Sequence, residues 1–372
     1  MIKRILSYLN NRIPKEERII FTSFPSYSDN SYALYRYIMA NRPDICRKYE
    51  ILWAQDTPER IPEDVDTHKV FEKKSLRGIM LFLKARYVIS THGYFSGIRS
   101  GNGQLQLNLW HGCGFKDIPE EEQVYRGDIT ISSGEFYRKI QAKALKMPLD
   151  SVIPTGLPRT DELFDENDAL FRLGIDENKY KKIIIWLPTY RSGTDGREDS
   201  FGVKTISTDE YKKLNDLLDQ KGYLLIVKLH PLDSEPEEFD SFDNVFFLKT
   251  HMMMEREVQL CQLLSKTDIL LSDYSSVIVD YLMLDKPVAM VFSDLKEYEN
   301  NRGFVFENIE DYMVGEKISG FDQLYDYFEN CDAVNEKWKI RRRELTNLFN
   351  DYFDGQSSKR VCDLIFGEYN EA

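Results

Sequence analysis

DILLSDYSSVIVDYLML, residues 268–284, contains a short apolar run, a polar turn and a second apolar run. The first run, ILLS, is typical of a buried strand, and the second is typical of an apolar helix that begins after two serines. Strands joined by helices form parallel sheets, because the helix carries the chain back to the edge where the next strand starts. This stretch therefore predicts an α/β fold.

The same alternation of strand and helix patterns extends through most of the chain. It begins near residue 18, stops at an acidic stretch around residues 161–168 and starts again at residue 181. A mainly parallel sheet is therefore expected in each half, and 372 residues are enough for two domains. The expected parts are an N-terminal helix at 1–17, a first domain at 18–168, a second domain at 169–335 and C-terminal helices at 336–372.

The composition of the chain excludes several classes of protein. A hydrophobic fraction of 42% and an aromatic fraction of 13% indicate packed cores rather than disorder. The net charge of −13 argues against general nucleic-acid binding, which needs clustered cations. The five cysteines show no CxxC spacing, so they predict neither a zinc site nor a disulfide framework and fit a reducing cytoplasm. No apolar run reaches about 18 residues, the length needed to span a bilayer.

The first 13 residues have the pattern of a basic amphipathic helix. The apolar positions are Ile2, Ile5, Leu6, Leu9 and Ile13, with Lys3, Arg4 and Arg12 between them. Such a helix can lie in a membrane interface with its cations near anionic lipid, or it can pack on its own domain. A second basic stretch at residues 337–343 can add to a membrane contact or form a solvated helix face.

Polar residues follow three strand-type runs of the second half. Thr189 follows KIIIWLP, and Lys228 shares one strand face with His230 at the end of YLLIVKLH. Ser275 and Ser276 follow ILLS after a two-residue turn. Ligands of open parallel sheets bind at the carboxyl ends of strands, so these residues are candidates for a binding site.

The start of the helix after Ser276 can bind an anion. Its first N–H groups carry a partial positive charge, and two serine hydroxyls extend the set of donors for a phosphate. The alternative is that Asp273 or Ser275 only caps the helix. Asp280 lies among apolar residues of this helix, where a carboxylate needs a partner such as a ribose hydroxyl or a cation.

His111 is the corresponding feature of the first half. It follows the run LQLNLW and precedes Gly112 and Gly114, which allow a ligand to approach the backbone, and Lys116 adds a cation. An imidazole titrates near neutral pH and can accept a proton. Other histidines are weaker candidates for a functional role. His92, after RYVIS, is expected to line the cleft, and His68 and His251 are expected to be structural.

Several short motifs together resemble the CDP-glycerol glycerophosphotransferase family, the teichoic-acid primases and polymerases. They are WHG at 110–112, GLPRTD at 156–161, LPTYR at 187–191, KLHP at 228–231, SDYSSVIVDY at 272–281 and RGF at 302–304. Their order and spacing resemble the family from about Ser90 to Phe306, and DGQSS at 354–358 resembles its C-terminal end.

This resemblance implies a GT-B architecture of two Rossmann-like domains facing across a cleft. It further implies that a polyol phosphate, glycerol phosphate or ribitol phosphate, passes from a CDP-alcohol to a hydroxyl of a lipid-linked acceptor, releasing CMP. The product would be a teichoic acid or a related cell-surface or capsular polymer. The protein would be cytoplasmic and peripheral on the inner face of the cell membrane.

The resemblance also implies which residues act. His111 and His230 become the functional histidines, and His111 is the expected base. The expected donor-binding residues are Gly112, Lys116, Arg159, Pro188, Thr189, Arg191, Lys228, Asp273, Ser275, Ser276 and Asp280. No aspartate pair stands at a strand end, so neither a metal nor another cofactor is expected.

Two positions depart from the family pattern, and other functions remain open. Cys113-Gly114 stands where the family often has Thr-Pro, and the Gly-Pro expected after the RGF segment is absent from residues 312–315. Cys113 itself is expected to pack rather than to act as a nucleophile. The alternatives are a nucleotide-sugar glycosyltransferase, an epimerase, and a non-catalytic membrane-assembly protein with the same fold.

Overall fold

The computed structural model describes residues 2–56, 60–118, 123–189, 200–229 and 242–367. The chain forms two compact units. Unit 1 contains Met1–Cys113, Ile118–Asp165 and Asn350–Ala372, and unit 2 contains Gly114–Asp117 and Glu166–Phe349. The division differs from the ranges expected from the sequence at residues 114–117, which belong to unit 2, and at residues 336–372, which are divided between the two units.

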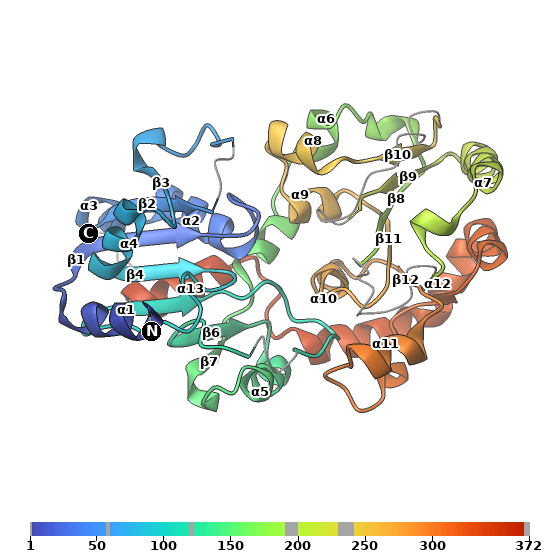
Figure 1. Ribbon diagram of the computed structural model, residues 1–372. Helices are drawn as coiled ribbons and strands as arrows, with labels where there is room; N and C mark the ends of the chain where they lie inside the picture. The colour runs from blue at the N-terminus through green and yellow to red at the C-terminus, as the bar shows by residue number, and fades with distance from the viewer. Residues whose placement is uncertain (1, 57–59, 119–122, 190–199, 230–241, 368–372) are drawn as a thin grey trace. The chain divides into compact units, whose positions relative to one another are not determined.

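Unit 1 is built on a parallel sheet of seven strands in the order β3-β2-β1-β4-β5-β6-β7 (Figure 1). The strands are β1 (Glu16–Thr22), β2 (Glu50–Gln55), β3 (Val70–Glu72), β4 (Ala85–Ser90), β5 (Leu105–Asn108), β6 (Ile129–Ser132) and β7 (Val152–Pro154). The α-helices are α1 (Ile2–Arg12), α2 (Asp29–Asn41), α3 (Pro43–Lys48), α4 (Leu76–Lys84), α5 (Glu135–Ala144) and α13 (Ser357–Phe366). The α/β class and the parallel sheet expected from the sequence are confirmed.

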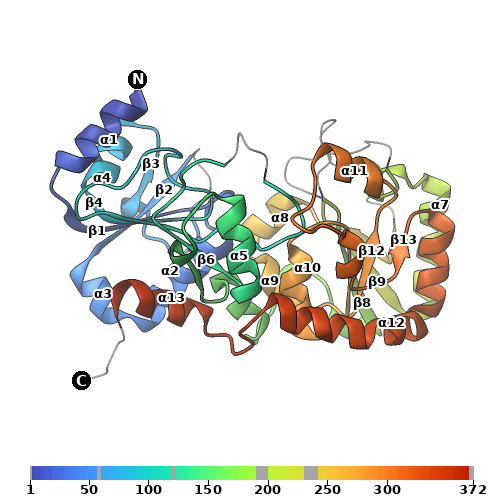
Figure 2. The same cartoon turned by 90° about the horizontal axis from the view of Figure 1, so that it is seen from below.

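Helices α1 and α4 lie together on one face of this sheet (Figure 2). The Ser75 hydroxyl accepts a hydrogen bond from the Gly78 N–H and so caps the start of α4. Phe82 of α4 is buried in the core, and Leu6 of α1 packs against the same cluster. One apolar stripe of α1 therefore packs on its own unit. No helix in the described part of the chain has the length and apolarity to cross a membrane.

Unit 2 contains a parallel sheet of six strands in the order β10-β9-β8-β11-β12-β13 (Figure 1). The strands are β8 (Lys182–Leu187), β9 (Tyr223–Val227), β10 (Val245–Phe247), β11 (Ile269–Ser272), β12 (Val288–Val291) and β13 (Lys317–Ile318). The helices are α6 (Ala169–Arg172), α7 (Thr208–Lys221), α8 (Thr250–Glu255), α9 (Leu260–Ser265), α10 (Val277–Tyr281), α11 (Leu295–Asn301) and α12 (Phe321–Phe349). Every residue of β9 and β11 is buried, as expected for central strands covered on both faces.

A four-residue segment, Gly114–Asp117, leaves the first half of the sequence and packs in unit 2. Lys116 forms an antiparallel bridge with Phe304, and the Val305 N–H donates to the Phe115 carbonyl oxygen at 2.9 Å. The Phe115 ring is fully buried, with its centroid 5.6 Å from that of Phe306. Burial of this ring therefore anchors the segment that follows His111.

Phe115 should contribute strongly to the stability of unit 2. We expect Phe115→Ala to lower the free energy of unfolding by about 3–5 kcal/mol, because a buried ring is lost and a cavity is left. Phe171→Ala is the matched control, since that ring is 82% exposed in the same unit. Urea unfolding followed by circular dichroism measures both variants, and equal effects would contradict the anchoring role.

Candidate active site

Two histidines meet at the carboxyl edge of the sheet in unit 1. His92 follows β4 and His111 follows β5, and these two strands are paired. Their rings are stacked, with centroids 4.4 Å apart and planes inclined by 5°. The sequence analysis predicted a functional role for His111 and predicted only that His92 lines the cleft. The signal that could have found the pair is the repeated arrangement of a strand followed by a His-Gly dipeptide, THG and WHG.

The backbone around His111 is held by side chains from other segments. Trp110 has a φ of +55°, an uncommon value for a bulky residue, and its N–H donates to the Asn108 side-chain oxygen at 3.1 Å. The Asn30 amide donates to the carbonyl oxygens of Leu109 and Trp110 at 3.2 and 3.0 Å. Gly112 follows with a φ of +122°, which favours glycine. These contacts fix the direction in which the His111 ring points.

Burial holds the pKa of the His111 imidazole well below its usual value. The neighbouring His92, Arg159 and Arg126 lower this pKa further, because a positive charge on any of them disfavours a positive charge on His111. Burial also lowers the pKa of His92, with Arg126 acting in the same direction and Asp29 in the opposite one. Near neutral pH, the His111 imidazole is therefore uncharged and has a ring nitrogen that can accept a proton.

Arg159, expected to bind the donor, lies in unit 1 beside His111. Its guanidinium donates to Asp29 at 2.9 Å and to the His111 carbonyl oxygen at 3.1 Å. Its backbone N–H donates to the Asn30 side-chain oxygen at 3.0 Å. Arg159 thus connects the GLPRTD motif to the WHG motif and supports the turn that carries His111.

The end of the GLPRTD motif has a structural contact. The two oxygens of Asp161 accept hydrogen bonds from the N–H groups of Ser357 and Ser358 at 2.8 and 2.7 Å. These are the first residues of α13, where free N–H groups favour a carboxylate. The DGQSS and GLPRTD motifs are therefore in direct contact within unit 1.

The candidate residues of unit 2 follow neighbouring strands. Pro188 and Thr189 follow β8, Lys228 follows β9, and Asp273 follows β11; β9, β8 and β11 are adjacent in the sheet. The parallel sheet therefore brings these residues to one edge, as the sequence predicted. His230 and Arg191 lie outside the described residues.

Asp273 stabilises this edge directly. Its carboxylate accepts hydrogen bonds from the Thr189 N–H at 3.0 Å, from the Thr189 hydroxyl at 2.5 Å and from the Tyr274 N–H at 2.7 Å. The group is buried, and these donors offset the cost of burial. Asp273 therefore ties the ends of β8 and β11 together.

Ser275, Ser276 and Asp280 lie at or within α10. The Ser275 hydroxyl accepts from the Val277 N–H at 3.4 Å, which is the local capping contact named as the alternative to phosphate binding. Asp280 is buried in the helix.

Ser276 also limits the space beside the segment that follows His111. A Cβ atom at position 114 would lie 2.9 Å from the Cβ of Ser276, so the space beside Gly114 is filled by Ser276 rather than open to a ligand. The side chain of Lys116 is half-buried.

Comparison with known proteins decides the family. The model of the CDP-Glycerol:Poly(glycerophosphate) glycerophosphotransferase family matches residues 5–367. The chain belongs to this family. It is 27% identical over 356 residues to the teichoic acid ribitol-phosphate polymerase TarL of Staphylococcus aureus, covering 88% of this chain and 61% of TarL. It is 24% identical over 391 residues to the teichoic acid glycerol-phosphate transferase of the same organism, covering 96% and 95%.

Members of this glycerophosphotransferase family differ in length. The chain spans 61% of TarL and 50% of the teichoic acid poly(glycerol phosphate) polymerase of Bacillus subtilis. Among solved structures, the wall teichoic acid polymerase TagF superposes with a TM-score of 0.78 at 22% identity, covering 98% of this chain and 92% of that one. This likeness confirms the GT-B fold expected from the sequence.

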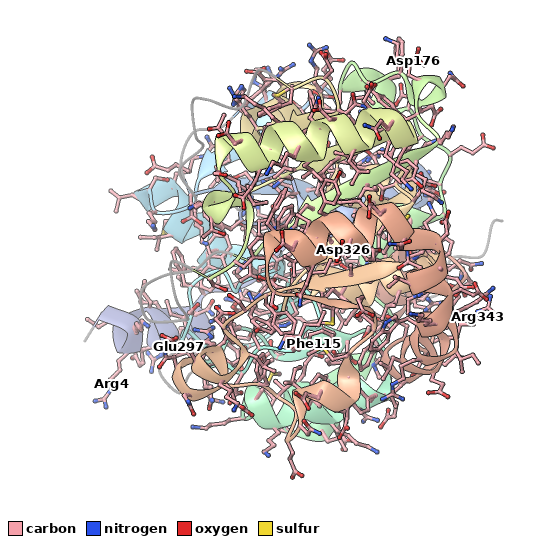
Figure 3. All side chains as sticks on the ribbon, turned by 90° about the vertical axis from the view of Figure 1, so that its right-hand side faces the viewer. Arg4, Phe115, Asp176, Glu297, Asp326 and Arg343 are labelled. Carbon is pink, nitrogen blue, oxygen red and sulfur yellow. The ribbon has the colours of Figure 1, made fainter. Side chains whose placement is uncertain are left out.

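The role of Asp273 in this glycerophosphotransferase-family chain can be tested by stability. We expect Asp273→Asn to lower the free energy of unfolding by about 1–3 kcal/mol, because an amide NH₂ would face a buried donor. Asp326→Asn is the control, since Asp326 stands on the outer surface of α12 in the same unit (Figure 3). Thermal unfolding measures both, and an unchanged midpoint for Asp273→Asn would exclude the structural role.

Proposed function

We propose that this protein transfers a polyol phosphate from a CDP-alcohol to a hydroxyl of a lipid-linked acceptor, releasing CMP, in the synthesis of a teichoic acid or a related surface polymer. The observation that carries the proposal is a histidine held at a sheet edge and stacked on a second histidine in a chain of this family. Relatives named as polymerases of ribitol phosphate and glycerol phosphate support it. A structure of TagF with CDPG supports a donor of this class.

In this reaction His111 acts as the general base. The acceptor hydroxyl loses its proton to the imidazole while its oxygen forms a bond to the β-phosphorus, and the bond from that phosphorus to the CMP oxygen breaks. An imidazole with a lowered pKa is uncharged at neutral pH and so is ready to take the proton. A positioned base accelerates such steps by about 10²- to 10⁴-fold.

Unit 2 holds the donor in this proposal. Thr189, Lys228, Ser275 and Ser276 follow adjacent strands, where hydroxyls and a cation suit a pyrophosphate. The proposed set also includes Pro188, Lys116, Asp280, His230 and Arg191, together with Gly112 of unit 1. Within unit 2, Gly114 lies against Ser276. No metal or other cofactor is included in the proposed reaction.

The base can be tested by separating transfer from binding. We expect His111→Ala to reduce CMP release by about 10²- to 10⁴-fold, because the proton acceptor is lost. Affinity for CDP-glycerol or CDP-ribitol, measured by calorimetry, should change little, since the donor is proposed to bind unit 2. His68→Ala is the control, because His68 is an exposed histidine of the same unit.

Two results would contradict this assignment. A loss of CDP-alcohol affinity in His111→Ala would make His111 a donor ligand rather than a base. Release of UDP from UDP-sugars, without release of CMP from CDP-alcohols, would favour the nucleotide-sugar alternative. A protein of similar fold binds UDP, since the MnaA-UDP co-structure of Staphylococcus aureus superposes with a TM-score of 0.53 at 14% identity, covering 94% of this chain and 96% of that one.

We also propose that unit 1 binds the cytoplasmic surface of the membrane through α1 and α4. Ile5 and Tyr8 of α1 are 51% and 55% exposed, and Leu76 and Met80 of the neighbouring α4 are also exposed. Arg4 projects away from α1 (Figure 3). Exposed apolar side chains flanked by cations suit an anionic lipid surface.

The second basic stretch, residues 337–343, is better explained as a solvated helix face. Lys339 pairs with Glu336, Arg341 with Glu344, and Arg343 with Asp285. These pairs lie on or against α12. Their carboxylates neutralise the cations that would otherwise attract an anionic lipid surface. The membrane proposal therefore rests on α1 and α4 alone.

The membrane surface can be tested by vesicle binding. We expect Tyr8→Glu to weaken binding to phosphatidylcholine vesicles containing phosphatidylglycerol by about tenfold. The tyrosine ring would no longer be buried in the lipid, and the added carboxylate would be repelled by the anionic headgroups. Ile340→Glu is the control, since Ile340 is 75% exposed on α12. Co-sedimentation measures both, and equal binding by the wild type and Tyr8→Glu would refute the proposed surface.

A further inference from the structure

The His111 ring belongs to a row of aromatic rings along the carboxyl edge of unit 1. Trp110 lies 4.3 Å from it between centroids, and His92 lies 4.4 Å from it. Phe24, which follows β1, meets His92 edge-on at 6.2 Å. Strands β1, β4 and β5 are adjacent, so the sheet itself sets the order of these rings. His92 is the member of the row that touches the proposed base and can itself carry a proton.

We propose that His92 is a positioning residue for the transfer step, fixing the plane of the His111 ring and limiting the stacked pair to one proton. This inference rests on the proposed function of His111 as the base. Two imidazolium rings stacked at this distance repel each other, so a proton on His92 prevents His111 from accepting one. When His92 is neutral, its ring presents an uncharged aromatic face to the imidazolium that forms on His111.

His92 is itself held firmly. Its Nδ1 is 2.8 Å from the Thr91 hydroxyl, and the Arg126 guanidinium donates to its carbonyl oxygen at 2.9 Å. Gly93 follows with a φ of +81°, and a Cβ there would lie 3.2 Å from the Cβ of Arg126. The Arg126 guanidinium also lies over the Trp110 ring, 5.7 Å from its centroid. A ring supported in this way can transmit its orientation to a stacked neighbour.

The charges around the pair favour the uncharged state. Arg126, Arg159 and Lys73 lower the pKa of His92, and Asp29 raises it. Burial acts first on both histidines and in the same direction. The proton that His111 takes from the acceptor hydroxyl passes to water before the next turnover, and His92 stays neutral throughout. Protonation of the pair before the substrate binds stops the reaction, so His92 helps to set the acid limit of activity.

The test compares two variants of His92 in the full chain. His92→Phe keeps a flat ring but cannot bind a proton, whereas His92→Ala removes the ring. Without a second titrating ring, the pKa of His111 should rise. The acid limb of kcat/KM for CMP release should move to lower pH in His92→Phe, because protonation at position 92 no longer stops the reaction. In His92→Ala, kcat should fall by about 10- to 100-fold with little change in KM for the CDP-alcohol, because the base loses its orientation. The fall in kcat should be smaller in His92→Phe.

A second readout does not depend on activity. The chain has five histidines, so ring-¹³C-histidine NMR can follow His111 in the wild type and in His92→Phe, with His68→Ala as the assignment control. An upward shift of the His111 titration midpoint, together with the shifted acid limb, supports the inference. An unchanged midpoint overturns it and makes His92 a packing residue, whatever the activity of His111→Ala. A shifted midpoint with an unchanged acid limb overturns the proposed base, and the role of His92 with it.

Discussion

The parallel pairing of β4 with β5 is the interaction on which the proposed active site depends. It brings the residues that follow each strand to one sheet edge, so that His92 and His111, 19 positions apart in the chain, stack face to face. Asn30 and Arg159 then hold the turn at residues 109–111 by donating to its carbonyl oxygens. The imidazole is thus oriented by backbone contacts as well as by its neighbouring ring.

Burial decides the chemistry of that imidazole. A histidine on a solvated loop would be partly charged near neutral pH, whereas desolvation and two nearby arginines keep His111 uncharged. The same environment opposes the positive charge that the proposed base would gain by accepting a proton. The stacked ring of His92 is the neighbour best placed to offset this opposition, because it adds contact without adding charge while it remains neutral.

The short family motifs combine chemical and structural tasks. His111 of the WHG motif is a candidate base. In the GLPRTD motif, Arg159 supports the loop that carries His111, and Asp161 accepts hydrogen bonds from the first residues of α13. Asp273 of the SDYSS segment likewise ties two strand ends together through Thr189. A buried charged group must be satisfied by partners, and such partners connect segments that are distant in the sequence. A recurring motif can therefore reflect folding as much as catalysis.

The amino-acid sequence was enough to predict the α/β class, the parallel sheets, the family and His111 as the leading candidate. The fold class and His111 follow from local patterns, such as strand-to-helix alternation and residues at strand ends, whereas the family follows from short motifs that resemble it. Tertiary structure alone decided that His92 stacks on His111, that Arg159 supports the histidine turn, and that Ser276 fills the space beside Gly114. These outcomes depend on contacts between residues far apart in the chain, and local periodicity does not encode which side chains a folded sheet brings together.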